Sequence, residues 1–412
     1  MDTHQRVSGL SGNEIYCLNK LGLRAGQLCV GNSVVSIGLG GGLGAGLSTL
    51  GGGEVRQITD LVHSGRMRAF ERMMDESRHY GGIGLTGVSF DMINHGGNLE
   101  FITVGSTLHA PEGQADQPRF STSADAQELY CQVDAEFVPV SFVFGNVAYS
   151  IGLGGSLAGA FTKLSRGEVS QYTQIFDETR HLALNRIIDA ARQAKANAVV
   201  GIQTTITPLM GAQEMMMVGT ASRHAALGNG DQIVTSDMTN QEMWNMANLG
   251  YMPLRLVMGV SVYSLGLKGG ILSTLQSLGG GEVQGLTELL YEAREKALAR
   301  VERDAERFGA DEVIGVKTRV YDLGGGLVEF MAIGTAVKKI PGVKTKSDAL
   351  PPQAIMVDQE TFVDSMRSVD VGMGRSKDSA RKTQGGPLSI IIFLFVIVFY
   401  IFKIFVVSRV GR

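Results

Sequence analysis

The chain of 412 residues contains one sequence pattern three times, at a spacing of 114 residues. The spacing relates glycines, Gly-Glu-Val triplets and arginines that occur in the same order in every copy. These positions are Gly31, Gly145 and Gly259; Gly53, Gly167 and Gly281; Arg66, Arg180 and Arg294. Near the end of the third copy the register slips by one residue, at Gly105, Gly219 and Gly334. A period this long indicates three tandem domains rather than a solenoid of small units.

Each copy has the pattern of a small α+β unit. It opens with an N-cap for a short helix, at Ser11, Asp125 and Thr239, and a Glu stands three residues later, as in a capping box. Strands rich in β-branched residues are predicted next, over residues 27–37, 141–151 and 256–265.

A long helix is clearest in the third copy, where apolar residues between Leu286 and Phe308 follow helical spacing and Gly309 stands where the helix would end. Two strands close that copy, over residues 312–321 and 327–337. The predicted fold class is α+β: three tandem repeats of a small sheet with one main helix packed across it. The repeats are placed at residues 10–110, 122–226 and 234–340.

Sheets of three strands have open edges unless another strand pairs with them. Units of this size also lie near the limit where oligomerisation commonly supplements the hydrophobic core. Both considerations predict that each unit has neighbours.

Three motifs of the third copy carry a resemblance to a known family. They are Glu292-Ala-Arg-Glu, Gly309-Ala-Asp-Glu-Val-Ile-Gly-Val and Met331-Ala-Ile-Gly-Thr-Ala-Val-Lys. The second copy matches through Ala196-Asn-Ala-Val-Val-Gly-Ile, and the first is the most divergent. The chain resembles the YbjQ-like (heavy-metal-binding) family of small bacterial proteins. The resemblance implies a compact α+β fold that assembles into closed homo-oligomeric rings and has no firmly assigned enzyme activity; triplication prevents the ring size from being carried over.

The end of the chain predicts a membrane span. The stretch that begins at Leu388 and ends at Val407 is strongly apolar and contains no charged residue except Lys403, and as a helix it would be about 30 Å long. We expect a transmembrane helix over residues 387–408, a polar tether over residues 341–386 with a brief helix over residues 359–366, and contact with the lipid bilayer. No signal peptide is recognisable, so we expect a single-pass protein of the cell (inner) membrane with its body in the cytoplasm.

Composition argues against several kinds of site. The net charge of −3 gives no basic excess for binding nucleic acid. The three cysteines and seven histidines form no metal-binding motif, and the third copy contains neither residue type. Cys17 and Cys131 occupy matching positions and are predicted to be buried side chains. The glycine-rich stretches over residues 38–54 and 268–282 lack the Gly-Lys-Ser/Thr of a phosphate loop. We therefore predict no enzyme activity, no cofactor and no metal site.

The recurring charged residues are the candidates for assembly contacts. Arg66, Arg180 and Arg294 are expected near the start of each long helix, and the recurring glutamates are Glu54, Glu168 and Glu282. An ion pair at a domain or subunit contact and a solvated helix face are both open for the arginines.

Two functions fit the sequence. The preferred one is a membrane-anchored structural protein that self-assembles into homo-oligomeric tiered rings or a cage. The alternative is a membrane-anchored sensor that binds a metal or a small ligand. A third arrangement, in which the three repeats close on one another within one chain, keeps the same fold.

Overall fold

The computed structural model describes residues 7–36, 53–95, 97–111, 119–150, 167–209, 212–228, 232–265, 284–324, 326–355 and 362–364. The predicted membrane span and most of both glycine-rich stretches lie outside these residues. Within them, no helix is long and apolar enough to cross a membrane.

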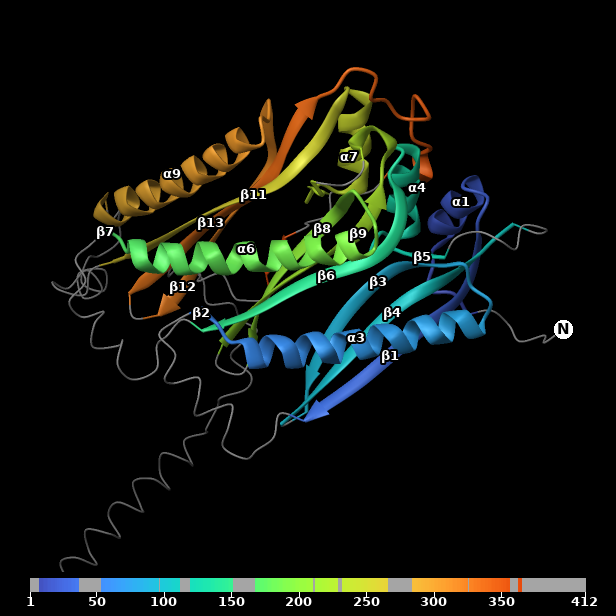
Figure 1. Ribbon diagram of the computed structural model, residues 1–412, viewed down its shortest axis with the longest axis horizontal. Coiled ribbons are helices and arrows are strands. Elements are labelled where there is room, and N and C mark those ends of the chain that lie inside the picture. The colour runs from blue at the N-terminus through green and yellow to red at the C-terminus, as the bar shows by residue number, and fades with distance from the viewer. Residues whose placement is uncertain are drawn as a thin grey trace, which may run out of the picture. The chain divides into compact units, whose positions relative to one another are not determined.

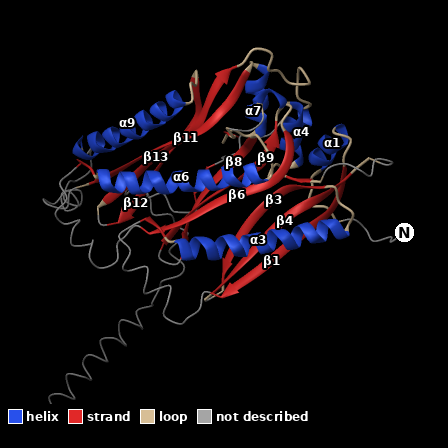
Figure 2. Cartoon of the chain, viewed as in Figure 1, coloured by secondary structure: helices blue, strands red, loops and turns tan. Residues whose placement is uncertain are grey.

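Three sheets, each with one long helix across it, make up the described chain (Figures 1 and 2). The first repeat consists of α1 (Gly12–Lys20), β1 (Arg24–Ser36), α3 (Arg56–His79), β3 (Gly84–Asn94) and β4 (Asn98–His109). The second consists of α4 (Ala126–Asp134), β6 (Val138–Ser150), α6 (Ser170–Gln193), β8 (Ala198–Leu209) and β9 (Ala212–Arg223). The third consists of α7 (Asn240–Asn248), β11 (Tyr251–Ser264), α9 (Gln284–Arg307), β12 (Glu312–Gly324) and β13 (Leu327–Lys339). The prediction of three tandem α+β units is confirmed.

Every sheet has the same topology. The last strand of the repeat lies in the middle and pairs antiparallel with the first strand on one side and with the second strand on the other, as in β1-β4-β3 and β12-β13-β11. The predicted caps are present at the short helices: Ser11 with Glu14 and Thr239 with Glu242 form capping boxes, and Asp125 accepts bonds from two backbone amides.

A recurring glycine allows each long helix to approach the first strand of its own sheet. A Cβ atom added to Gly145 would lie 2.3 Å from the carbonyl oxygen of Ala183 in α6. A Cβ atom added to Gly259 would lie 2.0 Å from the carbonyl oxygen of Ala297 in α9. No side chain fits at such positions, which explains why glycine recurs there.

Sheets and long helices alternate as layers. The core around α6 contains residues of its own sheet, such as Val199 and Met217, and residues of the third sheet, such as Met258 and Met331. The second sheet likewise packs on α3 through Ala148 and Phe144. Both α3 and α6 are therefore covered on two sides, by their own sheet and by the next one.

Short strands also join neighbouring repeats at the sheet edges. β2 (Gly53–Glu54), which precedes α3, pairs antiparallel with β6, and β7 (Gly167–Glu168), which precedes α6, pairs with β11. In the opposite direction, β5 (Phe120–Ser121) and β10 (Val234–Thr235) pair parallel with β3 and β8 of the preceding repeat.

The segment after the third repeat differs from its prediction. Residues 341–355, assigned to a polar tether, pack against the short helices: η2 (Pro352–Ala354) includes the fully buried Ala354, and Asp134 of α4 accepts bonds from Ser347. The predicted brief helix over residues 359–366 is wrong, because β14 (Phe362–Asp364) is a strand that pairs parallel with β8. An available sheet edge provides hydrogen bonds that a short isolated helix would lack.

Candidate functional site: the contact between neighbouring repeats

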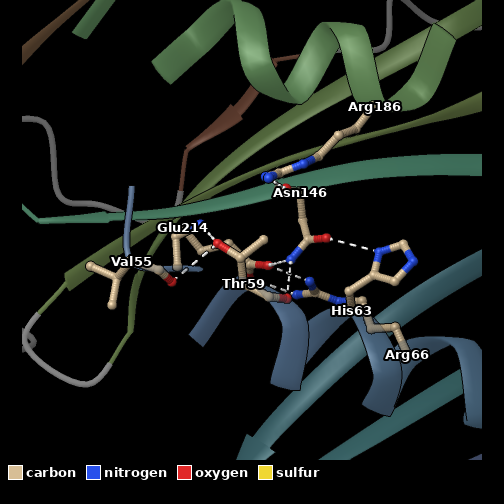
Figure 3. A network of polar contacts seen from close by, with 8 residues as sticks. Val55, Thr59, His63, Arg66, Asn146, Arg186 and Glu214 are labelled. Atoms are coloured by element: carbon tan, nitrogen blue, oxygen red, sulfur yellow. Dashed lines mark hydrogen bonds and ion pairs between the residues drawn. The ribbon is translucent and has the colours of Figure 1, made fainter. Parts of the chain in front are cut away.

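A buried arginine joins the first repeat to the second. Arg66, in the middle of α3, makes a bidentate ion pair with Glu214 of β9. Nη1 of Arg66 contacts Oε1 of Glu214, and Nη2 of Arg66 lies 2.7 Å from Oε2. The two side chains are only 4% and 1% exposed. Figure 3 shows both residues within a network of polar contacts. A bidentate pair of this kind fixes direction as well as distance.

The second repeat joins the third in the same way. Nη2 of Arg180, in α6, lies 2.8 Å from Oε2 of Glu329 in β13, and Nε lies 3.1 Å from Oε1. Both side chains are fully buried. Burial by itself would lower the pKa of Arg180, but the Glu329 carboxylate outweighs it and raises the pKa above its usual value, so the guanidinium stays charged.

Further bonds around these pairs recur from one contact to the next. The backbone N–H of Ala148 donates to the Thr59 hydroxyl at 3.0 Å, and the N–H of Val262 donates to the Thr173 hydroxyl at 2.9 Å. Asn146 adds a side-chain bond of 3.0 Å to Glu214 (Figure 3). Because each threonine stands seven residues before the arginine of its helix, one helix face supplies both contacts.

The recurring glutamates Glu54 and Glu168 also bridge repeats, but with different partners. Oε1 of Glu54 accepts a bond of 2.6 Å from Arg186 of α6, and Oε1 of Glu168 accepts one of 2.7 Å from Arg300 of α9. Burial raises the pKa of Glu168, and bonds from Arg300 and Lys296 outweigh that effect, so the pKa is lowered. Glu282, the third member of the set, lies outside the described residues.

Arg294 of the third repeat and Glu100 of the first stand at the sequence positions equivalent to those of the buried pairs, but they do not meet within the described chain. Arg294 is 45% exposed and contacts its helix neighbours Glu295 and Tyr291. Glu100 of β4 accepts a bond of 2.7 Å from His95, which lowers the pKa of its carboxyl group. The docking that joins the first repeat to the second and the second to the third is therefore not repeated from the third to the first.

Sequence reasoning missed the partners of the arginines. Glu100, Glu214 and Glu329 follow the same spacing, including the slip of one residue in the third copy, and that signal could have identified them. The arginines also lie near the middle of their helices rather than near the start, because α3 and α6 begin directly after the short strands β2 and β7.

The described residues contain no cluster of three or more His, Cys, Asp or Glu side chains arranged to hold a metal ion. Cys17, Cys29 and Cys131 are buried, and burial is the main cause that raises the pKa of each thiol. Such thiols are poor nucleophiles and poor thiolate ligands. The site in the described residues consists of buried ion pairs and hydrogen bonds between folded units.

Comparison with known proteins agrees with the repeated fold. The family described as "Putative heavy-metal-binding" (YbjQ) matches residues 23–107, 136–225 and 248–339. An encapsulin nanocompartment protein of Mycobacterium tuberculosis is 30% identical over 232 residues, which cover 53% of this chain and 86% of that protein.

Smaller relatives match over about the length of one repeat. A UPF0145 protein of Thermotoga maritima is 44% identical over 85 residues, covering 21% of this chain and 80% of its own length. One of Thermoplasma acidophilum is 37% identical over 99 residues, covering 22% and 83%. Since the three family matches together span more than half of the sequence, the chain belongs to the YbjQ family and carries three copies of its domain.

Proposed function

We propose that this protein is a structural protein that assembles with further copies of itself, and that it is not an enzyme. The observation that carries the proposal is the repeated docking contact. The same arrangement, a long helix packed on the next sheet with a buried arginine–glutamate pair, joins the first repeat to the second and the second to the third. The first repeat has the sheet side of a further contact of this kind, and the third repeat has the helix side. A contact that adds each unit in the same orientation continues into another copy, and it either closes a ring or extends a filament.

Apolar side chains at the outer surface of the first repeat support this proposal. Val30 and Val34 of β1 are 48% and 58% exposed. Their counterparts in the second repeat, Phe144 and Ala148, are 5% and 0% exposed, because α3 covers them. A sheet face that is buried in two repeats and open in the first is the surface expected where another copy docks.

The other end of the chain gives matching support. Val316 of β12 is 40% exposed, whereas the equivalent residues Val88 and Ile202 are 2% and 0% exposed. In the first two repeats, the segment that begins the next repeat covers this position. The backbone N–H of Val88 donates to the carbonyl oxygen of Thr122, and the backbone N–H of Ile202 donates to the carbonyl oxygen of Ser236. Beyond the third repeat, a second copy could supply that segment.

The mycobacterial relative bears a name that denotes a compartment-forming protein. This similarity, together with the repeated docking, favours closed rings or a cage over an endless filament. We further propose that the apolar stretch from Leu388 to Val407 attaches the assembly to the inner membrane, with the repeats in the cytoplasm; its length and composition support this proposal.

The size of the full-length protein in solution tests the proposal. We expect mass photometry of the detergent-extracted chain to give particles of many times 44.0 kDa, and electron microscopy to show rings or closed shells of uniform diameter. Single chains at micromolar concentration in both measurements would contradict it.

A further inference from the structure

We propose that Arg294 on α9 of one copy pairs with Glu100 on β4 of the next copy, so that copies associate head to tail. This inference rests on the proposed self-assembly and specifies its contact. The helix face of the third repeat would cover the open sheet face of the first repeat of a second copy, as α3 covers the second sheet and α6 the third.

The acceptor side has the geometry of the two contacts already formed. Glu100 stands opposite Val34 in the β1–β4 pairing. Glu214 stands opposite Ala148, and Glu329 stands opposite Val262, in their own sheets. The three carboxylates therefore occupy one register position of three equivalent sheets.

Polar neighbours of Glu100 repeat those of Glu214. The side-chain amide of Asn32 donates to Oε1 of Glu100 at 3.4 Å, as that of Asn146 donates to Glu214 at 3.0 Å. Arg72 donates to the carbonyl oxygen of Asn32 as Arg186 does to that of Asn146. The first repeat thus holds its carboxylate beside the same asparagine and arginine groups, without an arginine from a preceding repeat; His95 binds Glu100 in its place.

The donor side is equally well matched. Arg294 is 228 residues after Arg66, and Thr287 is 228 residues after Thr59. In the formed contacts the threonine accepts from the N–H of Ala148 or Val262, and the equivalent residue of the first repeat is Val34. One helix face thus presents the arginine and the threonine that a further sheet would require.

The start of the first repeat completes the contact in the opposite direction. Thr122 and Ser236 accept, through their hydroxyl groups, a bond from the N–H two residues later, and Ser8 does the same for Leu10. The segment around Ser8 therefore resembles those that cover Val88 and Ile202. It fits over Val316 of a preceding copy, and this places both halves of the contact on the same pair of chains.

The chemistry of the pairing gives it polarity. A cation at one end of the chain meets an anion at the other, so identical ends would bring like charges together, and head-to-tail association is favoured. When the sheet covers Arg294, water is excluded from the ion pair, as it is around Arg180 and Glu329. An unpaired arginine in that position would be strongly unfavourable.

Charge reversal in the full chain tests the pairing. Arg294→Glu and Glu100→Arg should each raise the protein concentration at half-assembly by about tenfold or more, as seen by mass photometry, because each places like charges at a covered contact. The double variant R294E/E100R should assemble again, since its ends are complementary once more. Lys195→Glu, a matched charge reversal at an exposed residue beyond the end of α6, should assemble like the natural protein. Circular dichroism of each variant monitors folding.

The outcomes separate this inference from the proposed function. If the natural protein assembles and the single variants do so equally well, or if the double variant is not restored, the Arg294–Glu100 pairing is overturned and self-assembly stands. If the natural protein remains a single chain, both proposals fail. Loss in each single variant with recovery in the double variant supports the pairing.

Discussion

The two buried arginine–glutamate pairs are costly features to place inside a protein. Removing both charges from water is unfavourable, and the attraction between them commonly offsets that cost only when geometry and surrounding bonds are good. Their value therefore lies mainly in selecting one orientation of a neighbouring repeat. A mispositioned repeat would leave a charged group buried without a partner, whereas a purely apolar contact would tolerate slippage.

Replacing one or both members of the pair between Arg180 and Glu329 tests this interpretation. Arg180→Met leaves the carboxylate buried and should reduce the free energy of unfolding by about 3–5 kcal/mol. The double variant R180M/E329M removes both charges and should recover most of that loss. Urea unfolding measures the free energy of unfolding of each variant, provided that the dependence of this free energy on urea concentration has the same slope in all of them. Equal losses in the single and double variants would show that packing volume, and not charge, matters at this position.

At the scale of single elements, the sequence predicted the regular features well. The first strands, the short capped helices and the end of α9 just before Gly309 follow from β-branched runs, N-caps and a glycine with positive φ, all of which are local signals. The short strands β2 and β7 were not predicted, because two residues contain no periodicity and pair only with another repeat. The partners of Arg66 and Arg180 were missed for a related reason, because they lie in the following repeat.

Close approach of helix and strand gives a prediction for Gly145. Gly145→Ala would place a methyl group 2.3 Å from the carbonyl oxygen of Ala183 and 2.6 Å from the amide of Ile187, and both are backbone atoms that move only with the helix. We expect a loss of about 2 kcal/mol or more in the free energy of unfolding. Gly12→Ala, at the start of α1, is the matched control. A Cβ atom added there meets no atom of another part of the chain within 4 Å, so the free energy of unfolding should change by less than about 1 kcal/mol. A similar small effect at Gly145 would contradict the packing argument.

Across the whole described chain, three sheets alternate with three helices, and the series has two unlike ends. One end exposes the face of the first sheet, and the other exposes a side of α9. The spacing of 114 residues predicted the number of units, and their α+β pattern predicted the fold class. The sequence did not predict that α3 and α6 are each covered by the following sheet, because no local pattern distinguishes a helix packed on one side from a helix packed on two.

The open face of the first sheet makes a prediction about exposed apolar side chains. The double variant V30E/V34E adds two negative charges where the counterparts in the second repeat are buried. Its thermal unfolding as a single chain should differ little from that of the natural protein, because both positions are already exposed to water. Assembly, in contrast, should be lost, since covering two carboxylates beside Glu100 is strongly unfavourable. Val138→Glu, at an exposed apolar residue of β6 in the second repeat, which already has a neighbouring repeat on both sides, is the control that should assemble normally. Should V30E/V34E form particles of natural size, the open sheet face would not be part of the contact between copies, and the layered series would end at the first repeat.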